Sequence, residues 1–185
     1  MTLKEIEIIK SCQKGDLERF GELYDDYIDK IYNFIYYKTS HRETAEDLTS
    51  KTFFKAVKNI QSFGKKEKYF AAWLFQIARN TVIDHYRSSK KTANIEDFWD
   101  IDSGEDLLVD LENKEKILLV KKYLAEIKSE KRDIVIMRIW QGMSYREISE
   151  ILGKNEGSVK VMFSRTIKEM KKNLPIEVIL LILIF

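Results

Sequence analysis

A single proline, Pro175, is found in this chain of 185 residues, and glycines add only seven further turn formers. A many-stranded sandwich or barrel needs far more of them, because each short strand must end in a tight turn. Long helices have no such need, and the apolar residues recur at the helical spacing of three and four. The sequence therefore predicts an all-α protein.

Four stretches with this spacing lie in the first half of the chain. We expect helices over residues 3–13, about 16–35, about 41–60 and 69–88. Asp16 is the expected N-cap of the second helix. Ser40 and Glu43 match the capping box expected at the start of the third helix.

Charge is divided unevenly along the sequence. Residues 1–91 carry a net charge of +4, residues 92–112 carry −8, and residues 113–174 carry +7. Two basic blocks on either side of an acidic, self-repelling segment indicate two polyanion-binding modules joined by a flexible linker. The alternative is that lysine-rich faces only keep the helices soluble.

These changes in charge suggest the domain boundaries. We expect two small helical domains, over 1–91 and 113–174, joined by an acidic flexible linker over 92–112. An apolar tail over 175–185 follows the second domain. Its helical length of about 15 Å is too short for a hydrocarbon core of about 30 Å, so it cannot cross a bilayer.

The second module has the pattern of a helix-turn-helix. We expect four helices in it, over 113–128, 130–141, 144–152 and 156–172. Ser144 and Glu147 match a capping box, Gly153 suits the tight turn, and Asn155 can cap the last helix. This spacing in a basic module favours DNA binding. An ordinary helical hairpin with a solvated basic face is the alternative.

The last helix of this motif is the expected reading helix. Hydroxyls and long cations on its outer side can reach base edges and phosphates. The outward residues are Ser158, Lys160, Val161, Ser164, Arg165 and Lys168.

The first module carries aromatic residues beside basic ones, a combination that can stack unpaired bases and hold their backbone. Phe70 and Trp73 lie on the inward stripe of their helix, so we expect both to be core residues. Phe63 and the lysines of its loop, including Lys65, are the better candidates for contact with melted DNA strands.

No catalytic or metal-binding pattern emerges from the sequence. Cys12 is the one cysteine, and His41 and His85 lie far apart, which leaves little for a metal site or a nucleophilic pair. The chain has no phosphate loop, dinucleotide fingerprint or zinc-protease motif. We therefore expect a protein that is not an enzyme and needs no cofactor. Acidic residues near Met1 do not suit a secretory signal, so we expect a cytoplasmic protein.

Three stretches together resemble the bacterial RNA polymerase sigma factors of the extracytoplasmic-function (ECF, group IV) type. They occur in the family's order and spacing over roughly residues 5–174. The stretches are AEDLT (45–49) with FFKA (53–56), WLFQIARN (73–80) with DHYR (84–87), and GMSYREI (142–148) with ILG (151–153) and EGSVK (156–160).

The resemblance implies a dissociable subunit that binds core RNA polymerase and directs promoter-specific initiation. It implies core polymerase binding by Glu46, Asp47, Ser50 and Lys51. It implies recognition of the −10 DNA element by Arg79, Asn80, Arg87 and the loop that holds Phe63 and Lys65. The −35 element would receive the helix from Ser158 to Lys168, and an anti-sigma factor is a further candidate partner.

Three features depart from the family pattern. Ile127 and Lys128 stand where a Leu-Pro pair often precedes the family's sixth helix. Met162 stands where the family commonly has arginine, which removes one candidate contact with the −35 element. Residues 176–185 are nearly all apolar, and we expect much of this tail to be exposed as a patch for self-association or for a membrane surface.

Two other functions remain open on the sequence alone. A stand-alone helix-turn-helix transcriptional regulator would explain residues 113–174 but not the helix over 45–60 or the acidic linker. An interaction protein tethered to a membrane by the tail is the other alternative.

Overall fold

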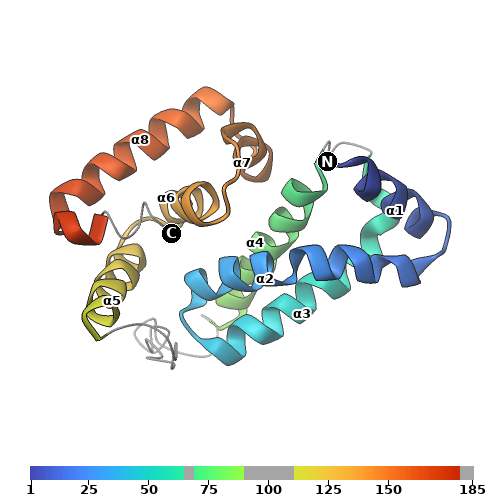
Figure 1. Cartoon of the computed structure of the whole chain (residues 1–185), viewed down its shortest axis with the longest axis horizontal. Helices are drawn as coiled ribbons and strands as arrows, with labels where there is room; N and C mark the ends of the chain where they lie inside the picture. Colours follow the sequence, from blue (N-terminus) through green and yellow to red (C-terminus); the bar gives the residue numbers. More distant parts are fainter. Residues whose placement is uncertain (65–68, 90–110, 180–185) are drawn as a thin grey trace.

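The structure is a computed structural model, and it describes residues 1–64, 69–89 and 111–179. The regular elements of these residues are all helices, so the all-α prediction is confirmed. Figure 1 shows two groups of helices, which correspond to the two expected modules. The predicted linker lies outside the described residues up to residue 110, and the next helix begins at Leu111.

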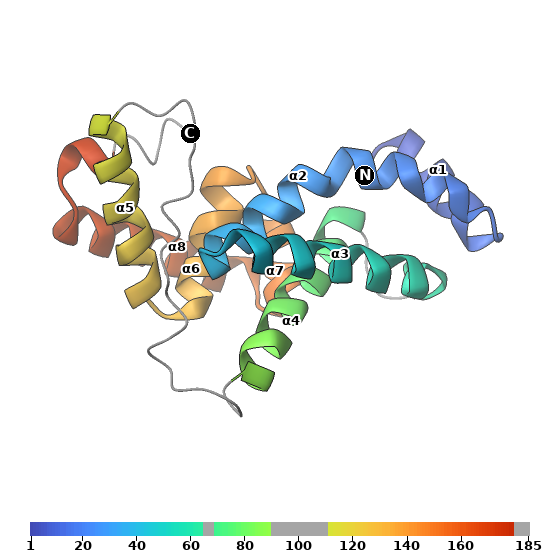
Figure 2. The same ribbon diagram turned by 90° about the horizontal axis from the view of Figure 1, so that it is seen from below.

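Four helices build the N-terminal module: α1 (Leu3–Gln13), α2 (Phe20–Thr39), α3 (Arg42–Asn59) and α4 (Phe70–Ser89). Two 3₁₀ turns, η1 (Leu17–Arg19) and η2 (Ile60–Ser62), join them. Helices α2, α3 and α4 pack on one another, and Figure 2 shows α1 at the far end of this group. Because each helix has an apolar stripe, packing buries those stripes together.

The expected N-caps of two helices are wrong. Ser40 is in the left-handed region, with φ of 53°, and it ends α2 instead of starting α3. His41 caps α3, because its Nδ1 accepts a hydrogen bond of 3.2 Å from the N–H of Thr44. Asp16 makes no side-chain cap, since η1 intervenes before α2 begins at Phe20.

The C-terminal module contains α5 (Leu111–Glu126), α6 (Ser129–Val135), α7 (Tyr145–Leu152) and α8 (Glu156–Asn173). A π-helical turn, η4 (Ile136–Trp140), continues α6. The single helix expected over 130–141 is therefore two elements of different pitch. Helix α8 packs on α6 and α7.

The two modules also pack against each other, which the sequence did not predict. Helix α4 lies along α7, and α2 touches η4. One apolar cluster runs through both modules and includes Phe34 and Phe75 on one side and Ile136 and Ile148 on the other. The two modules therefore share one hydrophobic core in this structure.

The apolar tail is only partly where we expected it. Residues 176–179 form a short helical turn after Pro175, and Ile176 is 62% exposed. Val178 and Ile179, however, are buried in a second core with Val120 and Met170, so the expected exposed patch is wrong for these two residues. The turn folds back because α5, α6 and α8 leave apolar surface that its side chains cover. Residues 180–185 lie outside the described part of the chain.

No helix within the described residues combines the length and the apolar content needed to cross a bilayer.

Burial of the tail makes a prediction about stability. Val178→Ala should lower the free energy of unfolding by about 1–3 kcal/mol, because it leaves a cavity in the second core. Ile176→Ala, on an exposed residue of the same turn, should change it by less than about 0.5 kcal/mol. Urea unfolding of both variants measures the difference. Equal effects would contradict the packing described for Val178.

Candidate nucleic-acid interface and partner-binding helix

Helices α7 and α8 form the predicted helix-turn-helix. Ser144 and Glu147 make the capping box of α7, with the Ser144 N–H donating to Glu147 Oε2 at 2.8 Å. Gly153 ends α7 in the left-handed region, with φ of 63°. Asn155 then caps α8 by accepting a hydrogen bond of 2.7 Å from the N–H of Ser158. These caps fix where each helix ends, and so fix the angle at which α8 is presented.

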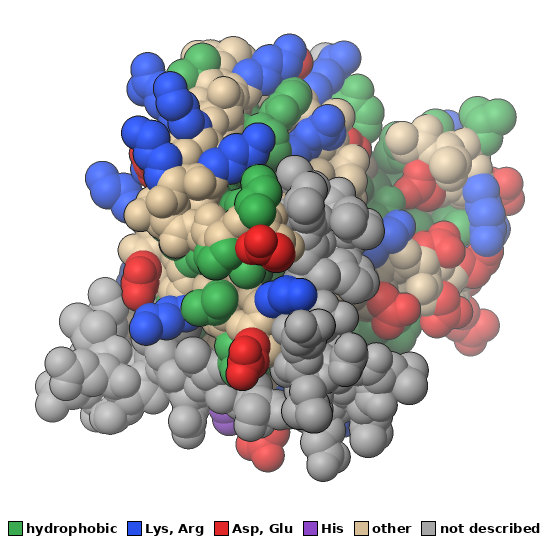
Figure 3. Space-filling model, turned by 60° about the vertical axis from the view of Figure 1, so that its left-hand side comes forward, with side chains coloured by type: hydrophobic (Ala, Val, Ile, Leu, Met, Phe, Trp, Pro, Cys, Tyr) green, Lys and Arg blue, Asp and Glu red, His purple; other side chains and the backbone are tan. Residues whose placement is uncertain are grey.

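One side of α8 is packed and the other is free. Val159, Thr166 and Met170 are buried, and the ring of Phe163 meets Tyr145 edge-on at 5.8 Å. All six residues predicted to face outward are exposed: Ser158, Lys160, Val161, Ser164, Arg165 and Lys168. Figure 3 shows Lys and Arg side chains gathered over the upper part of the face that includes this module. A convex helix with short hydroxyls and cations on its free side suits a major groove.

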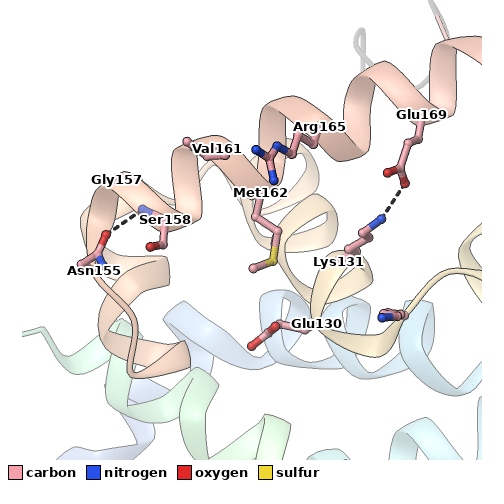
Figure 4. Close-up of a pocket in the computed structure, with 10 residues that line it drawn as sticks. Glu130, Lys131, Asn155, Gly157, Ser158, Val161, Met162, Arg165 and Glu169 are labelled. Atoms are coloured by element: carbon pink, nitrogen blue, oxygen red, sulfur yellow. Dashed lines mark hydrogen bonds and ion pairs between the residues drawn. The ribbon is translucent and has the colours of Figure 1, made fainter.

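A groove runs between α8 and the start of α6, with a volume of about 780 Å³. Figure 4 shows Met162 pointing into this groove below the guanidinium of Arg165. Lys131 spans the groove and pairs with Glu169 at 2.6 Å, which holds α6 and α8 together. Met162 therefore puts a neutral thioether inside the groove, where an arginine would place a cation beside Arg165.

The predicted −10 residues on α4 do not share one surface. Asn80 and Arg87 are exposed, and Asp84 lies between them on the same face. Arg79 points away toward the C-terminal module, where its Nε lies 2.8 Å from Oδ2 of Asp133. Adjacent helix positions differ by about 100° in direction, which separates Arg79 from Asn80. Lys65 lies outside the described residues.

Phe63 is not available for base stacking, which corrects the expectation for this residue. Its ring packs on Phe70 at 5.6 Å and on Trp73 at 5.3 Å, and only 6% of the residue is exposed. The Gln13 side chain also donates a hydrogen bond of 2.9 Å to the Phe63 carbonyl. The ring contacts and the hydrogen bond to the carbonyl both hold Phe63 against the core, so it is a core residue like Phe70 and Trp73.

The exposed face of α3 carries the residues expected to bind polymerase. Glu46, Asp47, Ser50 and Lys51 are all exposed. Lys51 pairs with Asp47 at 2.5 Å. Pairs at this spacing on an exposed helix contribute only a few tenths of a kcal/mol, so they leave the face free for a partner.

Phe54 belongs to the same face and was missed as a site residue by our sequence reasoning. It is 71% exposed, whereas its neighbour Phe53 is buried and meets Tyr24 at 4.7 Å. The spacing in the sequence already indicates this position: Phe54 follows Ser50 by four residues and Lys51 by three, and residues at these spacings lie on the same face of a helix. A large exposed aromatic beside charged residues is typical of a protein–protein anchor.

A buried ion cluster joins the two modules. Asp133 of α6 is fully buried and pairs with Lys38 of α2 and with Arg79 of α4. Burial lowers the pKa of Lys38, and the charge of Asp133 opposes that shift. No periodicity or motif in the sequence marks this cluster, because its members come from three helices.

Two family models match the chain. Sigma-70 region 2 matches residues 23–92, and sigma-70 region 4 matches residues 117–170. The ECF RNA polymerase sigma factor BldN of Streptomyces coelicolor is 34% identical in a match 177 residues long that covers 92% of this chain and 66% of BldN. The ECF RNA polymerase sigma factor SigW of Bacillus subtilis is 30% identical over 90% of this chain and 94% of SigW.

A solved structure shares the arrangement of helices. The sigma factor RpoE of Bartonella quintana, in complex with the anti-sigma factor NepR, superimposes with a TM-score of 0.67. The match covers 85% of this chain and 97% of RpoE at 22% identity, so it supports the fold alone.

The turn before α8 makes a prediction with a matched control. Gly153→Ala should lower the free energy of unfolding by about 1–2 kcal/mol, because a Cβ is strained in the left-handed region. Gly21→Ala should raise it by up to about 0.5 kcal/mol, since Gly21 is in the first turn of α2, where an added Cβ meets nothing within 4 Å. Urea unfolding measures both signs. A neutral Gly153→Ala variant would show that the turn does not require this geometry.

Proposed function

This chain belongs to the ECF RNA polymerase sigma factors, and from that membership we propose that three of its faces divide the work of promoter recognition. Sigma factors direct promoter-specific initiation by core RNA polymerase and are not themselves catalytic. In our proposal α3 binds core polymerase, α4 binds the −10 element and α8 binds the −35 element. The observation that carries it is that α8 is packed on one side and exposes all six predicted DNA-facing residues on the other.

Core polymerase binds the face of α3 that holds Asp47 and Phe54. The carboxylates and Lys51 provide orientation, and the exposed ring of Phe54 provides apolar area for a pocket on the partner. Burying Phe54 against a partner would remove water from the largest exposed aromatic side chain of this helix.

The −10 element binds along α4 at Asn80 and Arg87. Both are exposed on the same face of α4. The amide of Asn80 can hydrogen-bond to a DNA base, while Arg87 contacts the sugar–phosphate backbone of the DNA. Phe63 does not contribute to this face, because it is buried.

The −35 element receives α8 in its major groove. Ser158 and Ser164 are short enough to approach base edges or phosphates, and Arg165 is long enough to reach a guanine. Lys160 and Lys168 supply the salt-dependent attraction to phosphate.

The proposal also includes a regulatory partner and a cellular location. An anti-sigma factor is a candidate regulator, as RpoE of similar fold is found with NepR. The chain would act in the cytoplasm beside core polymerase. A stand-alone helix-turn-helix regulator is excluded as the main function, because it leaves the region 2 match over residues 23–92 without a role.

Asp47→Lys tests the polymerase-binding face. Reversing this charge should weaken association with core polymerase by about 2–5 kcal/mol if Asp47 meets a cation that becomes buried. Asp25→Lys, an equal charge change at an exposed position of α2, should have little effect. A pull-down with purified core polymerase compares the two, with circular dichroism as a check on helix content. Equal binding by both variants would remove Asp47 from the interface.

Arg165→Ala tests the −35 contact. If Arg165 pairs with a guanine, the variant should lose about 1–3 kcal/mol of binding and become tolerant at one base position. If it contacts only phosphate, binding should fall evenly and the salt slope should drop by about one. Run-off transcription with core polymerase measures promoter choice. Lys171→Ala, in the last turn of the same helix, is the control, and equal promoter strength in both variants would contradict the assignment.

A further inference from the structure

Two consecutive leucines of α5 are exposed, although another side of this helix is packed. Leu118 is 39% exposed and Leu119 is 44% exposed. Val120 and Leu124, by contrast, face the second core and are 6% and 2% exposed. Successive helix positions differ by about 100° in direction, so the run from Leu118 to Val120 cannot face one core. A helix with apolar residues on several sides is typical of one that makes a second contact.

A third exposed apolar side chain, Ile176, lies in the turn that packs beside α5. Val178 and Ile179 hold this turn in place, because they share the second core with Leu124. Ile176 points away from that core and is 62% exposed. Figure 1 shows α5 and the end of α8 side by side at one end of the molecule. Folding therefore places exposed apolar side chains from two segments at this end.

Lysines accompany these apolar side chains. Lys122 follows Leu118 by one helical turn, so it lies on the same exposed side of α5. Lys171 and Lys172 are exposed in the last turn of α8, shortly before Ile176. Figure 3 brings this end of the molecule forward and shows hydrophobic side chains next to those of Lys and Arg. None of these three lysines is among the residues that we propose to bind DNA.

The mixture of exposed leucines and lysines discriminates between partners for this surface. Duplex DNA would attract the lysines, but its charged backbone offers nothing to the leucines. A second copy in a two-fold contact would bring Lys171 and Lys172 of both copies together, and like charges repel. An anionic lipid surface satisfies both kinds of side chain, because its headgroups attract ammonium groups and its acyl boundary takes up apolar side chains.

The sequence that follows this surface suits the same partner. Residues 180–185 read LLILIF and contain no charged side chain; they lie outside the described residues. Six residues reach at most about 20 Å, which keeps them near Ile179. Apolar residues beside lysines are typical of a segment that binds at the membrane–water interface.

We propose that this end of the C-terminal module is a docking surface for anionic phospholipid membranes. The surface consists of Leu118, Leu119, Lys122, Lys171, Lys172 and Ile176. Its leucines and isoleucine enter the acyl boundary, while the lysine stems lie along it and their ammonium groups stay among the headgroups. This function goes beyond promoter recognition, and neither assignment depends on the other.

Co-sedimentation of the full-length chain with vesicles tests the proposal. The chain should bind vesicles of mixed phosphatidylglycerol and phosphatidylcholine. It should bind vesicles of phosphatidylcholine alone at least about tenfold more weakly, because its lysines then meet no anionic headgroups. Added salt should weaken binding to the anionic vesicles, since it screens exposed charges. Equal binding to both compositions, or binding to neither, would overturn the proposal.

Charge variants locate the contact on the molecule. Lys171→Gln combined with Lys172→Gln should lower binding to the anionic vesicles by about tenfold or more, since each lysine near such a surface contributes about fivefold. Glu177→Gln removes an exposed acid from the turn and should raise binding by about threefold or more. The control, Lys10→Gln with Lys14→Gln, removes equal charge from exposed positions at the far end shown in Figure 2. Equal losses in both lysine pairs would indicate general charge attraction and sink the assignment.

Apolar variants separate this surface from the residues that follow it. Leu119→Gln should lower binding by about fivefold or more, because a leucine is lost from the acyl boundary. Leu17→Gln, at a leucine of η1 that is 47% exposed, should leave binding unchanged. Deleting residues 180–185 should weaken binding but preserve the effect of Leu119→Gln. If the deletion abolishes binding while Leu119→Gln and the Lys171/Lys172 pair bind like the wild type, the surface is not the contact.

Two further measurements exclude other causes. Circular dichroism should show unchanged helix content in the substitution variants, because every substituted side chain is exposed. Sedimentation equilibrium without lipid should give the same mass for the wild type and for Leu119→Gln. A wild-type oligomer that Leu119→Gln dissociates, in a chain that binds no vesicles, would assign the surface to a second copy and overturn the proposal.

Discussion

Burial of the apolar side of α4 is the interaction on which the other elements depend. Helix α4 packs against α2 and α3 of its own module and against α7 of the other. Phe70, Leu74 and Phe75 are almost completely buried in these contacts. Because that side of the helix is fixed by three neighbours, Asn80 and Arg87 are left on the opposite, exposed side. The proposed DNA-binding face of α4 is thus a consequence of hydrophobic packing.

Local signals in the sequence predicted local structure well. The spacing of apolar residues predicted the helices, and Ser144, Gly153 and Asn155 predicted how the helix-turn-helix begins and turns. Such signals act within a few residues, so neighbouring positions contain all the information. The N-cap of α3 shows the limit, because Ser40 is a preferred cap residue and histidine is not. The left-handed backbone at Ser40 nevertheless makes it the end of α2 and leaves the cap of α3 to His41.

Long-range contacts could not be predicted in the same way. Phe63 has the composition of a base-stacking residue, but Phe70, Trp73 and Gln13 draw it into the core from separate parts of the chain. The sequence predicted that Val178 belongs to an exposed tail. The apolar surface that buries it comes from three other helices, and no pattern near Val178 indicates that surface. Asp133 had no visible role, since both of its partners lie more than 50 positions away. In each case the decisive partner is remote in sequence.

The π-helical turn η4 affects which changes of length the chain tolerates near Trp140. In this turn the N–H of Gln141 donates to the carbonyl of Ile136, five positions back, so one extra residue is accommodated after α6. Such a turn holds one extra residue without rotating the residues on either side of it, because the extra residue bulges out of the regular ladder of hydrogen bonds. Loss of one residue here would therefore restore a regular helix and leave Trp140 directed toward Tyr37. During evolution, a deletion of one residue should be tolerated in this turn more readily than within α7 or α8, where it would rotate the following side chains by about 100°.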